Sequence, residues 1–231
     1  MNKPFREAPD PTGWHHESVE EVQREGMAMS SSDFIRWGGL AGMVGGALWA
    51  LTPLREPLLG GEFPGHPVFR PYNLFLLLVA VLLIAGLLAL RARYRGSYGR
   101  LGTAGVVVVF VGYALLFLGS VPAVVLSAEG SRSLIMAGQD LGFLAALLAG
   151  VGAILLGIAL LRGRSASRAG ALLLIVALPV GFLGVIVVAA LGLVDIAGLP
   201  LTVLYGGAWI VLGIHLGSPQ SATTEQTPRV R

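Results

Sequence analysis

Residues 72–90 read YNLFLLLVAVLLIAGLLAL, an apolar run without a charged side chain. A helix needs about 20 residues to cross the hydrocarbon core of a bilayer, and this run has that length. It is apolar on every face, whereas the strands of a membrane barrel alternate between apolar and polar positions. The stretch therefore predicts a transmembrane helix.

Five further segments have the same character, which predicts an all-α, polytopic membrane protein built as a bundle of six transmembrane helices. They cover residues 34–54, 101–127, 140–161, 169–194 and 199–216. We expect a polar cytoplasmic N-terminal tail (1–33), a transmembrane domain (34–217) and a disordered cytoplasmic C-terminal tail (218–231). Similar Gly- and Arg-containing motifs at the helix ends fit three repeated helical hairpins, but such residues also occur wherever a helix leaves the cytoplasm, which is the more common reason for them.

The composition excludes a soluble enzyme. Hydrophobic residues make up 55% of the chain, charged residues 13%, and the mean hydropathy is +0.76. Soluble domains carry about 25% charged residues, so this chain cannot cover a globular surface with polar groups. Cysteine is absent, which excludes disulfides, thiolate metal sites and cysteine nucleophiles. The net charge of +3 comes from short loops rather than from one basic face, so we expect no nucleic-acid partner.

Arginine predicts the orientation in the membrane. Two alternate loops contain seven arginines, and the loops on the opposite side contain three. The seven are Arg91, Arg93, Arg95, Arg100, Arg162, Arg164 and Arg168. Because positively charged loops stay in the cytoplasm, both termini are expected there, in a cell membrane. Arginine makes up 15 of the 16 basic residues, a bias typical of GC-rich bacterial genomes.

Small residues recur at four-residue spacing in the first span. Gly38, Gly42 and Gly46 lie on one helix face, where they allow two backbones to approach closely. This face either packs inside the bundle, the interpretation we favour, or forms a homodimer contact. Gly142, Ala146 and Gly150 form a similar stripe in the fourth span.

Pro179 falls in the middle of the fifth span and predicts a kink there. Its missing N–H frees the carbonyl of Ile175, and this carbonyl then needs another partner. The mid-span hydroxyls of Tyr113 and Tyr205 are candidates. We therefore expect the bend to face the interior of the bundle, with a tyrosine nearby.

The loops opposite the arginine-rich side contain most of the reactive side chains. A polar vestibule is predicted there, formed by Arg55, Glu62, His66, Arg70, Glu129, Arg132, Asp140 and Asp195. Incidental ion pairs between solvated loops are the more common outcome. One histidine beside one carboxylate is too few ligands for a metal, and no nucleotide or catalytic motif is present. We expect no cofactor, no metal and no catalytic residue.

Three function classes stay open. The leading class is an accessory or interaction protein, whose partners are the lipid bilayer and another membrane protein or a second copy. The second is a small transporter or channel for a neutral or lipid-like substrate, because no ionisable residue lies mid-span to couple transport to protons. The third is a membrane enzyme acting on lipids.

Overall fold

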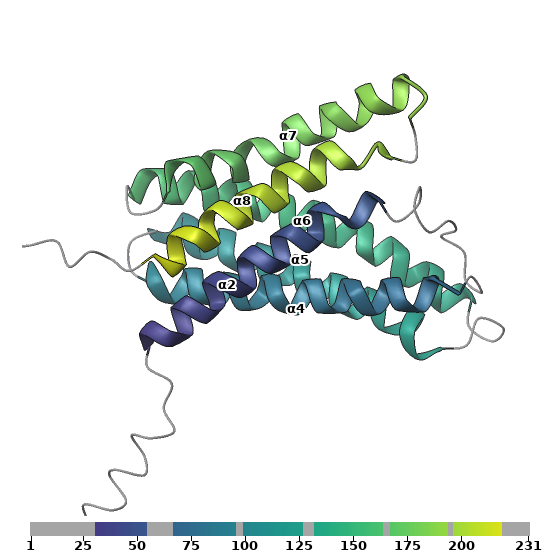
Figure 1. Cartoon of the computed structure of the whole chain (residues 1–231), viewed down its shortest axis with the longest axis horizontal. Helices are drawn as coiled ribbons and strands as arrows, with labels where there is room; N and C mark the ends of the chain where they lie inside the picture. The colour runs from purple at the N-terminus through teal and green to yellow at the C-terminus, as the bar shows by residue number, and fades with distance from the viewer. Residues whose placement is uncertain are drawn as a thin grey trace, which may run out of the picture. The chain divides into compact units, whose positions relative to one another are not determined.

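The computed structural model describes residues 31–54, 67–95, 99–126, 132–163, 167–193 and 196–218. Within these ranges it contains six long helices and no strand, which confirms the all-α bundle (Figure 1). Each helix is long and apolar enough to cross a membrane. The elements are α2 (Ser31–Ala50), the short 3-10 turn η1 (Thr52–Leu54), α4 (Phe69–Arg93), α5 (Gly99–Val125), α6 (Arg132–Gly163), α7 (Arg168–Ala190) and α8 (Leu199–Gly217).

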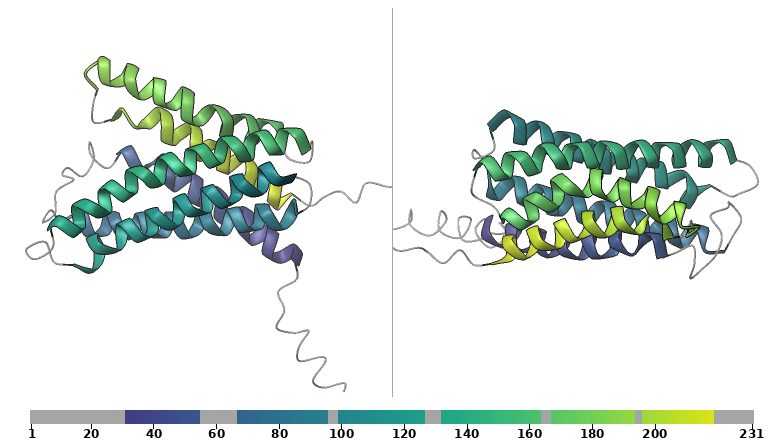
Figure 2. Two further views of the ribbon diagram at one scale, coloured as in Figure 1. Left: turned by 180° about the vertical axis from the view of Figure 1, so that it is seen from behind. Right: turned by 90° about the horizontal axis from the view of Figure 1, so that it is seen from above.

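Successive helices run antiparallel and pack against one another, and α2 closes the ring. Contacts join α4 to α5, α5 to α6, α6 to α7 and α7 to α8. α2 then lies between α4 and α8 (Figures 1 and 2). Gly38 packs against α4 and Gly39 against α8. We call one end of this bundle the arginine-rich end, because Arg36, Arg93, Arg100, Arg162 and Arg168 all lie there.

Several helix boundaries differ from the sequence-based prediction by a few residues, and two of the differences have a clear physical reason. α6 begins at Arg132 rather than at Asp140, because Ile135 and Gly138 pack into the bundle despite their polar neighbours. α7 ends at Ala190 rather than at Val194. Gly192 has a φ of +81°, and the bonds from Gly192 N–H to Ala189 and from Leu193 N–H to Val188 form a Schellman cap.

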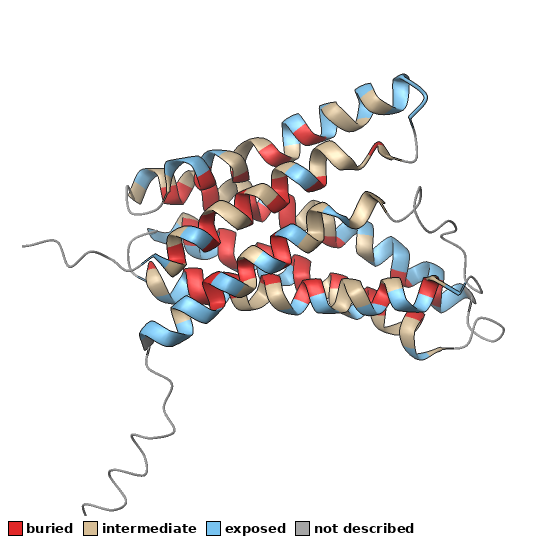
Figure 3. Cartoon of the chain, viewed as in Figure 1, coloured by how far each residue is buried: buried red, intermediate tan, exposed pale blue. Residues whose placement is uncertain are grey.

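The core is concentrated in the arginine-rich half of the bundle (Figure 3). Long side chains from α4, α6, α7 and α8 fill this half and are almost fully buried. They include Leu83, Leu87, Leu90, Leu156, Leu160, Leu174, Trp209 and Leu212. The opposite half has far fewer large buried side chains, and the cavities described below lie there.

Glycines at seven-residue spacing join α5 to α6. A Cβ at Gly112 would lie 2.7 Å from the backbone nitrogen of Ala149, and one at Gly119 would lie 2.6 Å from the carbonyl oxygen of Gly138. A Cβ at Gly105 would lie 2.7 Å from the backbone nitrogen of Leu156 and 3.1 Å from the carbonyl oxygen of Gly152. Close backbone approach of this kind drives helix association where lipid provides no hydrophobic force.

The glycine stripe of α2 packs inside the chain. A Cβ at Gly38 would collide with the Ala89 side chain of α4, and one at Gly46 would lie 2.6 Å from the carbonyl oxygen of Gly206 in α8. Gly42 sits between these sites, with the backbone of Gly86 at ordinary van der Waals distance. The three residues therefore hold α2 between α4 and α8.

The predicted tails lie almost entirely outside the described residues, which begin at residue 31 and end at 218. The repeat of three hairpins stays a prediction.

Candidate ligand cavity between α6 and α7

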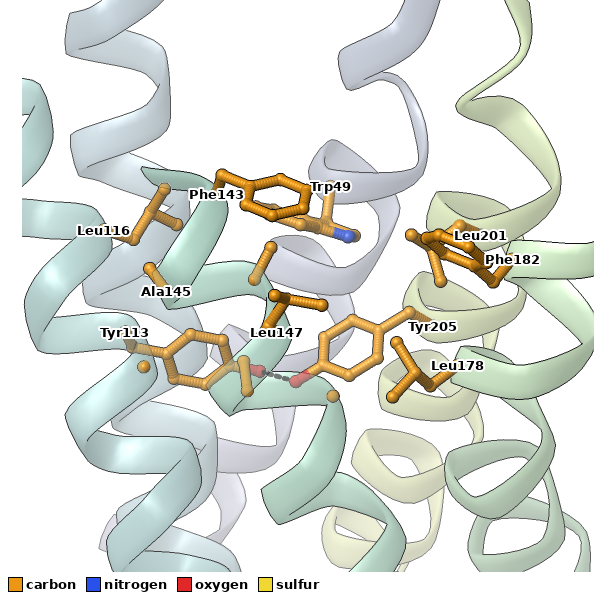
Figure 4. Close-up of a pocket in the computed structure, with 14 residues that line it drawn as sticks. Trp49, Tyr113, Leu116, Phe143, Ala145, Leu147, Leu178, Phe182, Leu201 and Tyr205 are labelled. Carbon is orange, nitrogen blue, oxygen red and sulfur yellow. Dashed lines mark hydrogen bonds between the residues drawn. The ribbon is translucent and has the colours of Figure 1, made fainter. Parts of the chain in front are cut away.

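A cavity of about 130 Å³ lies in the half of the bundle opposite the arginine-rich end. Its walls come from α2, α5, α6, α7 and α8, and almost all of the lining atoms are apolar (Figure 4). Among the described residues that line it, none is charged. They are Trp49, Gly112, Tyr113, Leu116, Phe143, Ala145, Ala146, Leu147, Ala149, Gly150, Leu178, Phe182, Leu201 and Tyr205.

The cavity reaches the outer surface of the bundle between α6 and α7. Phe143 of α6 and Phe182 of α7 both line it, yet their side chains are 66% and 48% exposed. Ala146 and Leu147 of α6 are half-buried beside them. In a bilayer this surface would face lipid tails, so the opening is lateral.

Small residues and a divergence of helices together create the space. Ala146 and Gly150 give α6 little volume on the side that faces α7. Gly157, nearer the arginine-rich end, packs tightly on Ala171 and Leu174 of α7. Beyond this contact the α7–α8 hairpin diverges from α4, α5 and α6, as Figure 1 shows. The cavity occupies the space between them.

Two tyrosines form the part of the cavity nearest the arginine-rich end. The hydroxyls of Tyr113 in α5 and Tyr205 in α8 share a hydrogen bond of 2.6 Å (Figure 4). The ring of Trp209 lies 6.2 Å from that of Tyr113, between centroids, and the Trp209 side chain is 1% exposed. Its indole nitrogen has no hydrogen-bond partner among the described residues. The apolar cavity thus ends at a small polar cluster.

A second, more polar cavity of about 340 Å³ adjoins the first at the end of the bundle opposite the arginines. Thr52, Asn73, Ser120 and Gln139 supply its polar atoms. The first three donate hydrogen bonds to backbone carbonyls three or four residues earlier in the chain, at 2.7 to 2.9 Å. The two cavities share Trp49, whose ring meets that of Tyr205 edge-on at 6.2 Å.

The arginine-rich end is closed by packing and by one long-range hydrogen bond. The guanidinium of Arg93 donates to the carbonyl of Leu216 at 2.9 Å, which joins α4 to the C-terminus of α8. A cation is favourable there because the last carbonyls of a helix lack partners. Burial raises the pKa of the adjacent Tyr94 above its ordinary value, although the charge of Arg93 opposes this shift.

Of the predicted polar vestibule, the described part of the chain includes the side chains of Arg70 and Asp140. Arg55, Glu62, His66, Glu129 and Asp195 lie outside the described residues, as does the side chain of Arg132. Arg70 and Asp140 are exposed, and neither lines either cavity. The polar cavity at this end is instead formed by uncharged side chains. The sequence-based prediction relied mainly on ionisable loop residues and did not include Thr52, Asn73 or Ser120. Polar residues at the ends of apolar runs were the available signal.

Pro179 lies on the exposed face of α7, while the preceding Leu178 lines the apolar cavity. The two candidate tyrosines bond to each other. The kink at Pro179 stays a prediction. The pyrrolidine ring of Pro179 is exposed and does not face the interior of the bundle.

Within the described ranges, no three or more His, Asp or Glu side chains come close enough together to hold a metal ion. Comparison with known proteins found no matching family model, curated protein or solved structure.

Proposed function

We propose that this multi-pass membrane protein binds one neutral, lipid-like molecule in the cavity between α6 and α7. The lateral opening beside Phe143 and Phe182 is the observation that carries this proposal. An apolar, uncharged lining disfavours ions and polar metabolites, because an unpaired charge placed there would lose its hydration. A molecule already dissolved in the bilayer reaches the cavity without crossing water.

The size of the cavity limits what it holds. At about 130 Å³ it is comparable to an engineered cavity of about 150 Å³ that takes up benzene. It therefore encloses one end of a chain-like molecule, and the remainder extends past Phe143 and Phe182 into the lipid. The positive-inside rule places the arginine-rich end in the cytoplasm. On this orientation the ligand enters from the outer leaflet.

Trp49 offers a direct test, because it lines the cavity while Trp37 is exposed on the same helix. In lipid nanodiscs, bromododecane should quench the fluorescence of Trp49 through its heavy atom. The Trp49 signal is the difference between the parent and Trp49→Phe. We expect quenching of Trp49 to saturate, whereas quenching of Trp37 rises in proportion to the probe.

Two substitutions in α6 form a matched pair for this experiment. Ala146→Phe fills the cavity and should abolish the saturable quenching. Val151→Phe adds the same ring to an exposed site on the same helix and should leave the quenching unchanged. If Trp49 shows no saturable component, or if Ala146→Phe leaves it intact, the proposed binding function is wrong.

Transport of the same molecule is a second candidate, favoured by the contact between the two cavities. A ligand that moved past Trp49 would pass from the apolar cavity into the polar one and leave the bilayer. Gly142 lines the polar cavity, and a Cβ there would meet no atom within 4 Å. Gly142→Leu should therefore fill this cavity, slow transfer of a neutral fluorescent lipid between proteoliposomes and an acceptor, and leave quenching of Trp49 unchanged. Equal transfer by both proteins would exclude this route.

The packing of α2 does not support the accessory role. A surface on this helix that binds a partner protein would need an exposed face of glycines. Gly38, Gly42 and Gly46 are not available for this, because they pack against α4 and α8. A lipid-processing reaction receives no support from the cavities, because the described lining residues include no carboxylate, histidine or arginine.

A further inference from the structure

The Tyr113–Tyr205–Trp209 cluster has more hydrogen-bond donors than it uses. Each tyrosine supplies one O–H and the indole supplies one N–H. The bond between the two hydroxyls consumes one O–H. The second tyrosine O–H and the Trp209 N–H have no acceptor outside the cluster among the described residues.

The two phenol oxygens are the cluster's own acceptors, and they cannot satisfy all of its donors. If the indole N–H donates to one phenol oxygen, one O–H is still left without an acceptor. The two hydroxyls cannot donate to each other at the same time, so the tyrosine that accepts the bond must direct its own O–H elsewhere. Such a donor is costly in a membrane interior, where no bulk water replaces the missing bond. Tyr113 and Tyr205 both line the apolar cavity, so the nearest space for an acceptor is the cavity itself.

We infer that the cavity recognises a neutral, lipid-like molecule through one hydrogen-bond acceptor oxygen, such as a ketone or ester carbonyl, placed against the Tyr113–Tyr205 pair. This inference rests on the proposed binding function and adds the chemical class of the ligand. The apolar walls take the chain next to the carbonyl, and the lateral opening takes the rest. A carboxylate is excluded, because no cationic side chain is among the described lining residues.

The test compares two uncharged competitors of similar size, methyl undecyl ketone and tridecane. Each is titrated into nanodiscs against bromododecane, with recovery of Trp49 fluorescence as the readout. One hydrogen bond in a membrane interior favours the ketone by about three- to tenfold in competing concentration. This comparison uses the unaltered protein, so it does not depend on the folding of a variant.

Substitutions then locate the donor. Either single change, Tyr113→Phe or Tyr205→Phe, leaves one hydroxyl without its tyrosine partner, so at least one of these variants should still prefer the ketone. The double variant removes both hydroxyls and should bind ketone and alkane alike. Its unchanged displacement by tridecane shows that the cavity itself has survived.

The outcomes separate the two proposals. If the ketone and the alkane compete equally in the parent, the acceptor inference is overturned while the binding function stands. The acceptor inference is overturned in the same way if the double variant keeps the full preference. If neither compound displaces bromododecane at any concentration, the binding function fails and the inference fails with it.

Discussion

Tyr113 and Tyr205 lie 92 residues apart in the chain, yet their hydroxyls meet at 2.6 Å between α5 and α8. α5 and α8 are not consecutive, so the bond crosses the interior of the helix ring. The bond lies at the boundary between the packed core and the cavity. Trp209 of the core packs on one side of it, and Leu116 and Leu201 line the cavity on the other side. The pair therefore contributes both to folding and to the proposed site.

The contribution of this pair to folding can be measured by a double-mutant cycle. Tyr113→Phe and Tyr205→Phe should each destabilise the protein, and the double variant should lose less than the sum of the single losses. Measured bonds between membrane helices average about 0.6 kcal/mol, so we expect a coupling energy of about 0.5–1.5 kcal/mol. Thermal unfolding in detergent gives the four values. Additive losses would show that the hydroxyls do not interact.

The α5–α6 contact should be the most sensitive to added volume. Gly112→Leu places a branched side chain against the backbone of Ala145 and Ala149, where a Cβ alone would lie within 2.8 Å. Because backbone cannot move aside as a side chain can, we expect a loss of at least about 2 kcal/mol, or failure to assemble. Gly142→Ala is the matched control in α6, since nothing lies within 4 Å of its Cβ. Equal melting temperatures for the two variants would contradict this packing.

The six spans were predictable because hydrophobic length alone determines them. The helix ends were less so, because Ile135 and Gly138 extend α6 through a polar stretch by packing on α5. Four-residue spacing drew attention to Gly142, where an added Cβ would meet no atom within 4 Å, whereas the glycines that join α5 to α6 recur every seven residues. Seven residues are close to two helical turns, so glycines at this spacing lie on one face of α5, and this face could have been predicted from the sequence.

The cavity was not predictable from the sequence. It depends on how far the α7–α8 hairpin diverges from α6, which is a property of tertiary packing. Tyr113 and Tyr205 were recognised as mid-span hydroxyls, but only the helix order places them face to face. Ionisable residues are the usual markers of a membrane site. Here the polar contribution comes from uncharged groups such as Asn73 and Ser120 instead.

Two glycines of the α2 stripe should respond differently to the same substitution. At Gly42 a Cβ would lie 3.5 Å from Gly86 and from the Trp209 ring, which is ordinary contact. Gly42→Ala should therefore be neutral or slightly stabilising, because alanine favours the helix. At Gly46 the Cβ would lie 2.6 Å from the carbonyl oxygen of Gly206, so Gly46→Ala should cost about 1–3 kcal/mol. Similar unfolding temperatures for the two variants would show that this face is not tightly packed.

The closure of the arginine-rich end should depend on Arg93 more than on its neighbour. Arg93→Gln removes the bond to the carbonyl of Leu216 and the cation at the end of α8, so we expect a loss of about 1 kcal/mol. Arg91→Gln makes the same change in charge at an exposed site on the same helix and should have little effect. Thermal melts of both variants distinguish the two cases, and equal losses would assign the effect to net charge rather than to the bond.

The orientation of the bundle determines which leaflet the cavity faces. Arg91, Arg93 and Arg100 border one loop, Arg162 and Arg168 border another, and translocating either would be costly. An alkaline phosphatase fusion after Leu161 should therefore be inactive, because that reporter works only outside the cytoplasm. The same fusion after Leu193, at the opposite end of α7, should be active. Matched fluorescent protein fusions should give the reverse pattern and control for expression. Phosphatase activity at Leu161 with none at Leu193 would invert the bundle and place the cavity in the cytoplasmic leaflet.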